Sequence, residues 1–191
     1  MEVVGEVPET HFVAAWVQAE YHSPFTQFAE VFDGTILPTE WATQPNTDDG
    51  EQNQMRAQVL ALLRPMVKAL PADTIWTQAR ANRADLRDCL LMAGPEWEAM
   101  TGGSRRVGDG LPFGPHHSPD HRRAICAIRG QLLRGAVFPS LISISRPQLD
   151  RIVVIEGNKR ALAYTGGRMA LPASIELYIG TSETINDFPF W

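Results

Sequence analysis

The run Glu156-Gly157-Asn158-Lys159-Arg160 places a carboxylate, a glycine and two cations side by side. It follows the β-branched run 152–155 and precedes the helical pattern 159–164, which predicts a turn from a buried strand into a helix. The first N–H groups of a helix lack partners within the helix, and with the helix dipole they attract anions. Gly157 allows the backbone to approach a phosphate closely. We therefore expect a phosphate-binding turn.

The side chains of this turn suggest individual roles. Lys159 and Arg160 add positive charge beside the amides of Gly157 and Asn158, and arginine can hold a phosphate through two hydrogen bonds. Glu156 is a candidate general base and a candidate Mg²⁺ ligand. The alternative is a structural turn with two solvated cations. Because cations at a helix N-terminus oppose the dipole, their presence favours an anion there.

A second glycine-rich loop, Gly102-Gly103-Ser104-Arg105-Arg106, has the composition of an anion-binding nest. If a nucleotide binds, Ser104, Arg105 and Arg106 are the second set of predicted phosphate contacts, and either arginine is a candidate to neutralise charge in a transition state. The alternative is a flexible surface loop.

Three histidines, His116, His117 and His121, surround a helix start at Ser118-Pro119. A metal site needs a further oriented ligand, which the pattern does not supply, so we expect a polar beginning of a helix and assign no metal firmly. His116 remains a candidate substrate contact.

The elements expected around these residues form a mixed α/β (α+β) chain. In the C-terminal part the patterns predict a helix, two strands, a helix and a strand, and the aromatic tail 188–191 is expected to dock on the body. The predicted ranges are 118–134, 139–145, 152–155, 159–164 and 173–179. In the N-terminal part, helices are expected at 11–21, 52–69 (kinked at Pro65), 85–92 and 96–100, whereas 73–79 is ambiguous.

We therefore predict a helical N-terminal part, 1–100, wrapped around a small mixed sheet in the C-terminal half, 101–191, the two forming one compact unit. With 191 residues the chain is long enough for one sizeable core.

The net charge of −5 does not suit a non-specific nucleic-acid binder. Cys89 and Cys126 have neither zinc nor disulfide spacing and are expected to be buried thiols. Because no signal peptide or membrane span is recognisable, we expect a cytoplasmic protein.

The run RIVVIEGNKRALAYTGG, followed by LPASIELYIG, resembles the signature of the ParB/sulfiredoxin superfamily. Its members share a strand, a turn with an acidic residue, glycine, a basic residue and arginine, then a helix and a strand led by proline. ICAIRGQLLRGAVFPSLISIS fits the preceding part, so the resemblance covers about residues 118–182. AEYHSPF is similar to an AE-x-x-SPR stretch of bacterial members with a ParB-like domain, with Phe25 in place of the arginine.

The resemblance implies a nucleotide- or phosphate-binding turn and allows its branches to be compared. Sulfiredoxins use a cysteine in the turn, which this turn lacks. Partition proteins bind CTP and DNA and carry a helix-turn-helix domain after the ParB domain, which we do not expect in this acidic chain. A third branch phosphorylates free serine, and Glu156, Gly157 and Arg160 match its turn, whereas Lys159 replaces a histidine. By its position in the chain, Glu20 is the counterpart of a second, distant glutamate.

These observations predict a nucleotide-binding ParB-like protein that transfers a phosphoryl group to a small hydroxyl compound or hydrolyses a nucleotide. Glu156 and Glu20 are the candidate catalytic residues, and His22 and Ser23 are candidate substrate contacts. ATP is the favoured nucleotide, with Mg²⁺ as a candidate cofactor. The alternatives are a non-catalytic regulatory or partner-binding module and a nuclease-like DNA-processing protein. We expect no membrane partner, regard DNA as unlikely to bind, and leave a homo-oligomer open.

Overall fold

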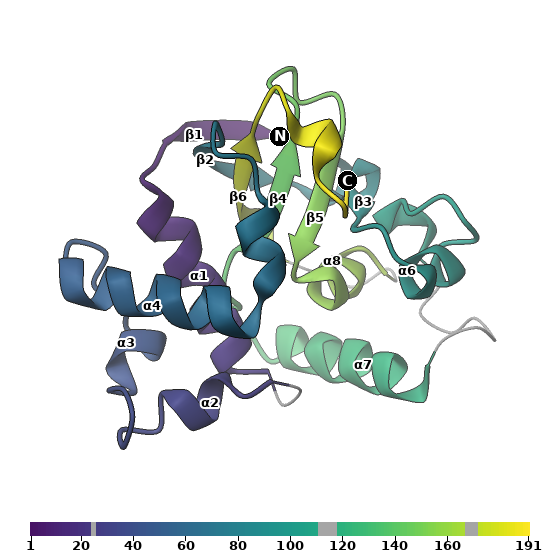
Figure 1. Cartoon of the computed structure of the whole chain (residues 1–191). Coiled ribbons are helices and arrows are strands. Elements are labelled where there is room, and N and C mark those ends of the chain that lie inside the picture. The colour runs from purple at the N-terminus through teal and green to yellow at the C-terminus, as the bar shows by residue number, and fades with distance from the viewer. Residues whose placement is uncertain (24–25, 111–117, 167–171) are drawn as a thin grey trace.

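The computed structural model describes residues 1–23, 26–110, 118–166 and 172–191. It confirms a mixed α/β fold built on a six-stranded sheet with strand order β1-β2-β6-β4-β5-β3 (Figure 1). The strands are β1 (Glu2–Glu6), β2 (Ile75–Ala81), β3 (Leu90–Leu91), β4 (Leu141–Ser145), β5 (Ile152–Glu156) and β6 (Ile175–Thr181). The α-helices are α1 (Glu9–Tyr21), α2 (Phe28–Val31), α3 (Glu40–Thr43), α4 (Gly50–Leu63), α5 (Arg83–Asp88), α6 (Pro95–Met100), α7 (Pro119–Leu133) and α8 (Asn158–Thr165). Short 3₁₀ helices are η1 (Pro65–Ala69), η2 (Val107–Asp109) and η3 (Ile185–Asp187).

The sheet is mixed, and β4 lies in its interior. β4 runs parallel to β6 and antiparallel to β5, β3 runs parallel to β5, and the β1-β2-β6 side is antiparallel. All residues of β4 are buried, as expected for a strand covered on both faces.

Each face of the sheet packs on its own hydrophobic cluster. Leu141 and Leu177 point to the face covered by α7, α8 and α5, whereas Ile142 and Ile144 point to the face covered by α1 and α4 (Figure 1). This alternation along β4 follows from the two-residue period of a strand. The beginning of β4 lies next to the end of β5, because the two strands are antiparallel. This edge of the sheet lies between helices of both layers, where a site can be enclosed.

The prediction of helices in the first hundred residues around a small mixed sheet from the C-terminal half was incomplete: that half supplies β4, β5 and β6, but the sheet has three more strands. The first hundred residues supply β1, β2 and β3. The valines of β1 are exposed, so the strand lacks the apolar alternation that sequence patterns detect. Pairing with β6 resolved the ambiguous segment 73–79 as β2, which shows that long-range hydrogen bonds decide such segments.

Two predicted helices were too long. The helix expected at 52–69 ends at Leu63, and Pro65 begins η1 rather than kinking a continuous helix, because proline cannot donate to the preceding turn. The helix expected at 85–92 ends at Asp88, after which Leu90–Leu91 pairs with β5. Pairing with a buried strand thus overrides the local helical pattern.

The predicted beginning of α7 was confirmed. Ser118 accepts a hydrogen bond from the backbone N–H of His121 (3.3 Å), and Pro119 is the first helical residue. Cys89 is buried as expected, but Cys126 is exposed, because α7 presents only one stripe to the core. No helix in the described ranges is long and apolar enough to cross a membrane.

Candidate functional site

The turn after β5 requires glycine. Gly157 has φ +87° and precedes the first residue of α8. A Cβ built there would lie 2.5 Å from Leu141 Cδ2 and 2.9 Å from Arg160 Nη2, so a larger side chain has neither the conformation nor the space. The close packing makes the turn rigid and fixes the direction in which β5 delivers Glu156.

Glu156, at the end of β5, and Arg160, in the first turn of α8, form an ion pair. The Nη2 atom of Arg160 donates to Oε2 of Glu156, and Nη1 donates to the carbonyls of Pro139 and Ser140. Exposure of the two side chains is only 8% for Arg160 and 16% for Glu156. Burial raises the pKa of Glu156, and the neighbouring charge of Glu20 acts in the same direction, whereas Arg160 lowers it. Arg160 thus positions a carboxylate that burial makes more basic.

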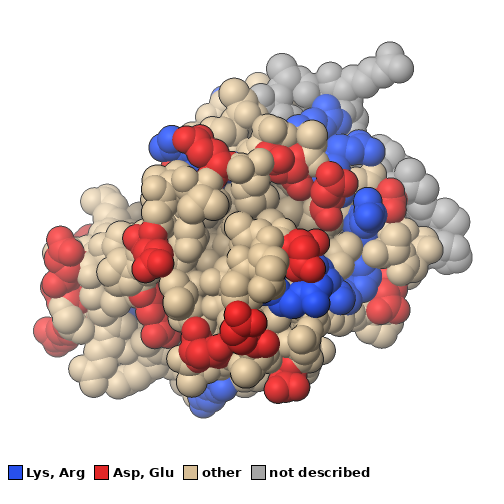
Figure 2. Space-filling model, turned by 90° about the horizontal axis from the view of Figure 1, so that it is seen from above, with Lys and Arg blue, Asp and Glu red and all other residues tan. Residues whose placement is uncertain are grey.

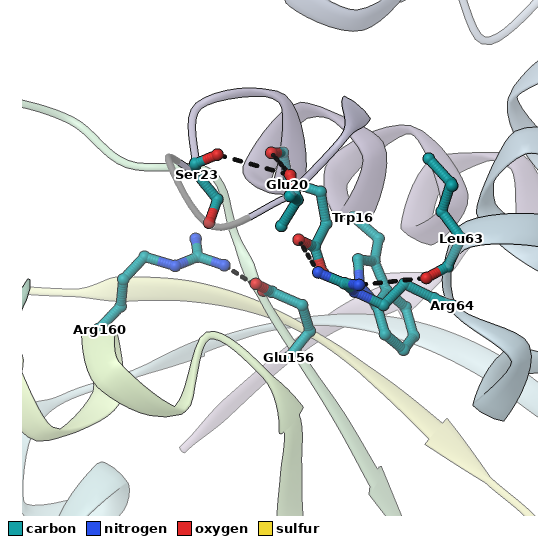
Figure 3. A network of polar contacts seen from close by, with 8 residues as sticks. Trp16, Glu20, Ser23, Leu63, Arg64, Glu156 and Arg160 are labelled. Carbon is teal, nitrogen blue, oxygen red and sulfur yellow. Dashed lines mark hydrogen bonds and ion pairs between the residues drawn. The ribbon is translucent and has the colours of Figure 1, made fainter. Parts of the chain in front are cut away.

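A second carboxylate, Glu20, comes from the last turn of α1 and faces this pair (Figure 3). Arg64, directly after α4, donates from Nε to Glu20 Oε1 at 2.5 Å and from Nη2 to Oε2 at 2.6 Å. Trp16 Nε1 also donates to Oε1, at 3.3 Å. Both carboxylate oxygens of Glu20 therefore accept hydrogen bonds within the protein.

The turn and the end of α1 line one cavity of about 700 Å³. This volume lies in the range of pockets that enclose small-molecule ligands. The predicted site residues that line it come from distant parts of the chain: Glu20, His22, Ser23, Glu156, Gly157, Asn158, Lys159 and Arg160. The fold thus brings together the two candidate catalytic glutamates and the predicted phosphate turn.

The side chain of Asn158 is engaged within the protein. It is buried, and its Oδ1 accepts a hydrogen bond from the backbone N–H of Met92 at 3.3 Å. This bond ties the turn to the segment after β3.

The loop with Ser104, Arg105 and Arg106, predicted as a second phosphate site, does not line this cavity. Arg105 donates to the carbonyls of Leu91 (3.0 Å) and Trp191 (3.2 Å). Arg106 lies 3.5 Å from Asp88, and the hydroxyl of Ser104 is bonded to the backbone of its own loop. Arg105 therefore binds backbone carbonyls, including one of the C-terminal tail, instead of the anion that was expected.

The docked tail itself agrees with prediction. Phe188 is buried, and the guanidinium carbon of Arg151 lies 4.8 Å from the centre of the Trp191 ring. The backbone N–H of Ala93 donates to the carbonyl of Phe190 at 3.1 Å. The tail therefore fixes the same segment whose Met92 N–H holds Asn158.

Two cations complete the charged lining. Lys159 is partly buried, and burial lowers its pKa, while Glu96 and Glu20 act against this. Arg123 of α7 lines the cavity and pairs with Asp120. Sequence reasoning missed Arg64 and Arg123, because neither lies in a motif and only the packing of α4 and α7 brings them to the site.

The histidines give no metal centre in the described structure. His121 stacks on Trp97 with ring centres 5.3 Å apart, and its pKa is lowered by burial and by Lys159. His116 and His117 lie outside the described residues. Among the residues that the structure describes, no cluster of three or more metal-ligating side chains is found. Glu156, a candidate Mg²⁺ ligand, is instead paired with Arg160.

The surface charge is mixed. Figure 2 shows several Lys and Arg residues gathered along one side of this face, with Asp and Glu beside them, rather than a basic stripe free of acidic residues. A nuclease-like surface would need such a stripe to follow a phosphate backbone. This face therefore gives no support to the DNA-processing alternative.

Comparison of the chain with protein-family models, with curated proteins and with solved structures gave no match.

Proposed function

We propose that this protein binds a nucleotide, with ATP favoured, through its phosphates at the Gly157 turn, and transfers a phosphoryl group to a small hydroxyl compound or to water. The observation that carries the proposal is the shared cavity: the beginning of α8 and the carboxylates of Glu20 and Glu156 line the same space. Phosphoryl transfer depends mainly on positioning and on charge stabilisation, and these groups supply both.

In this proposal the amides at the beginning of α8 and the ammonium of Lys159 bind the phosphates. Glu156 accepts the proton of the attacking hydroxyl, because burial raises its pKa towards that of a useful base. Glu20, held in place by Arg64, orients the acceptor or a nucleotide-bound Mg²⁺. Arg160 holds Glu156 in place.

Binding is tested first by thermal shift and calorimetry with ATP, ADP, CTP and GTP, each with and without Mg²⁺. Lys159→Ala is expected to weaken nucleotide binding by about tenfold or more, the loss of a charge-assisted contact. Lys68→Ala is the matched control, because Lys68 is the other lysine of the sequence and is exposed on η1. Absence of binding by every nucleotide would contradict the proposal, as would equal effects of the two substitutions.

Catalysis is tested separately, by measuring nucleotide turnover with small hydroxyl compounds. Glu156→Gln is expected to abolish turnover while nucleotide still binds.

One observation favours a second candidate function, a nucleotide-binding regulatory module: each carboxylate already has an arginine partner. Tight binding without turnover by the wild-type protein, across water and all hydroxyl acceptors tried, would favour that module.

A further inference from the structure

One wall of the cavity is a single face of α7. Arg123, Ala124, Ala127, Ile128 and Gln131 line it, and their spacing places them along one side of the helix. From the first to the last of them the helix rises by about 12 Å. The cavity therefore extends well beyond the phosphate turn, and a phosphate group alone would leave most of this wall uncovered.

The lining changes in chemistry along this wall. Arg123 lies in the first half of α7, and Lys159 lies close enough to the first turn for its charge to lower the pKa of His121. Beyond Arg123, the lining residues Ala124, Ala127 and Ile128 are apolar, and an alanine side chain is only a methyl group. Ala19 of α1 also lines the cavity. The cavity therefore has a cationic end and an apolar slot. These suit a ligand with an anionic end and an apolar part.

Gln131 is the last residue of this wall and is exposed to the cavity. The side-chain amide of Gln131 has one group that donates hydrogen bonds (NH₂) and one that accepts them (C=O). These two groups match the N7 edge of adenine, which offers the acceptor N7 beside the N6 amino donor. The same N7 edge of guanine offers two acceptors, N7 and O6, which leaves the amide oxygen of Gln131 without a donor.

We infer that the slot formed by Ala124, Ala127 and Ile128 binds the planar base of the nucleotide and that Gln131 is a specificity-determining residue that favours adenine. The inference rests on the proposed function, which supplies the phosphate end of the ligand. Apolar contact with the ring provides affinity, and the Gln131 amide provides discrimination, because a mismatched base leaves polar groups unpaired.

The test compares ATP, GTP and inorganic tripolyphosphate by calorimetry. Ala127→Leu fills the slot and is expected to weaken ATP binding by about tenfold or more, while tripolyphosphate affinity changes by less than about twofold. Because Ala127 is exposed and leucine is a good helix former, the substitution leaves α7 intact. Cys126→Leu is the matched control, because Cys126 is the exposed neighbour that does not line the cavity, and it is expected to change neither affinity.

Gln131→Ala is expected to reduce the preference for ATP over GTP by about tenfold, the value of one lost hydrogen-bonding partner. The inference is overturned if Ala127→Leu leaves ATP binding unchanged, or if it weakens ATP and tripolyphosphate equally. An unchanged ATP-to-GTP ratio in Gln131→Ala overturns the assigned role of that residue. Failure of the wild-type protein to bind tripolyphosphate and nucleotides alike would instead contradict the proposed phosphate site, which separates the two failures.

Discussion

Arg64 donates to both carboxylate oxygens of Glu20, although Glu20 lies in α1 and Arg64 directly follows α4. The distances are 2.5 Å from Nε to Oε1 and 2.6 Å from Nη2 to Oε2. The Glu20 side chain is 8% exposed, so its carboxylate is largely out of contact with water. The contact joins the end of α1 to the end of α4 beside the candidate site (Figure 3).

Replacement of Arg64 by alanine is expected to destabilise the fold by about 2 kcal/mol, because it leaves a largely buried carboxylate with Trp16 alone. Arg146→Ala is the control, since Arg146 pairs with Asp150 at the surface and its loss should cost less than about 1 kcal/mol. Urea unfolding measures both. Equal losses would mean that Glu20 does not depend on Arg64.

The pair of Glu156 and Arg160 is expected to show strong coupling in a double-mutant cycle. Arg160→Ala alone should cost about 3–5 kcal/mol, because it leaves Glu156 buried without its partner and frees the carbonyls of Pro139 and Ser140. Adding Glu156→Gln to Arg160→Ala should recover part of this loss. Additive effects in unfolding experiments would show that the two charges do not stabilise one another in the folded state.

Stability is expected to fall as the pH rises through the titration of Glu156. Because burial raises the pKa of this carboxyl above its ordinary value of 4.5, the folded state binds the proton more tightly than the unfolded state. Its contribution is complete below pH 4.5 and is lost as the pH rises through the higher folded pKa. The difference in unfolding free energy between wild type and Glu156→Gln, measured from pH 4 to pH 8, isolates this dependence. A constant difference would contradict it.

The two cysteines are expected to react at very different rates. Cys126 is exposed on α7, whereas Cys89 is buried with its pKa raised to about 12, chiefly by burial. A thiol reagent should therefore label one cysteine in the folded protein and both in denaturant, and peptide mass analysis identifies the sites. Rapid labelling of Cys89 in the native state would show that the core beside α5 opens readily.

The sequence by itself determined the local features of this protein. β-branched residues predicted β5, Gly157 predicted the turn, and Ser118-Pro119 predicted the start of α7, because these features depend on backbone conformation and on neighbours along the chain. The turn also contains five of the eight predicted site residues that line the cavity. That Glu20, His22 and Ser23 would join them rested on position in the chain alone.

Only the tertiary structure decided which distant elements meet. It turned an ambiguous segment into β2 and the end of a predicted helix into β3, because strand pairing outweighs local preference. It also assigned Arg105 to the C-terminal tail and placed Arg64 beside Glu20. No spacing in the sequence encodes these contacts: a guanidinium has many acceptors within reach, and its partner is settled by which carbonyls and carboxylates the fold buries beside it.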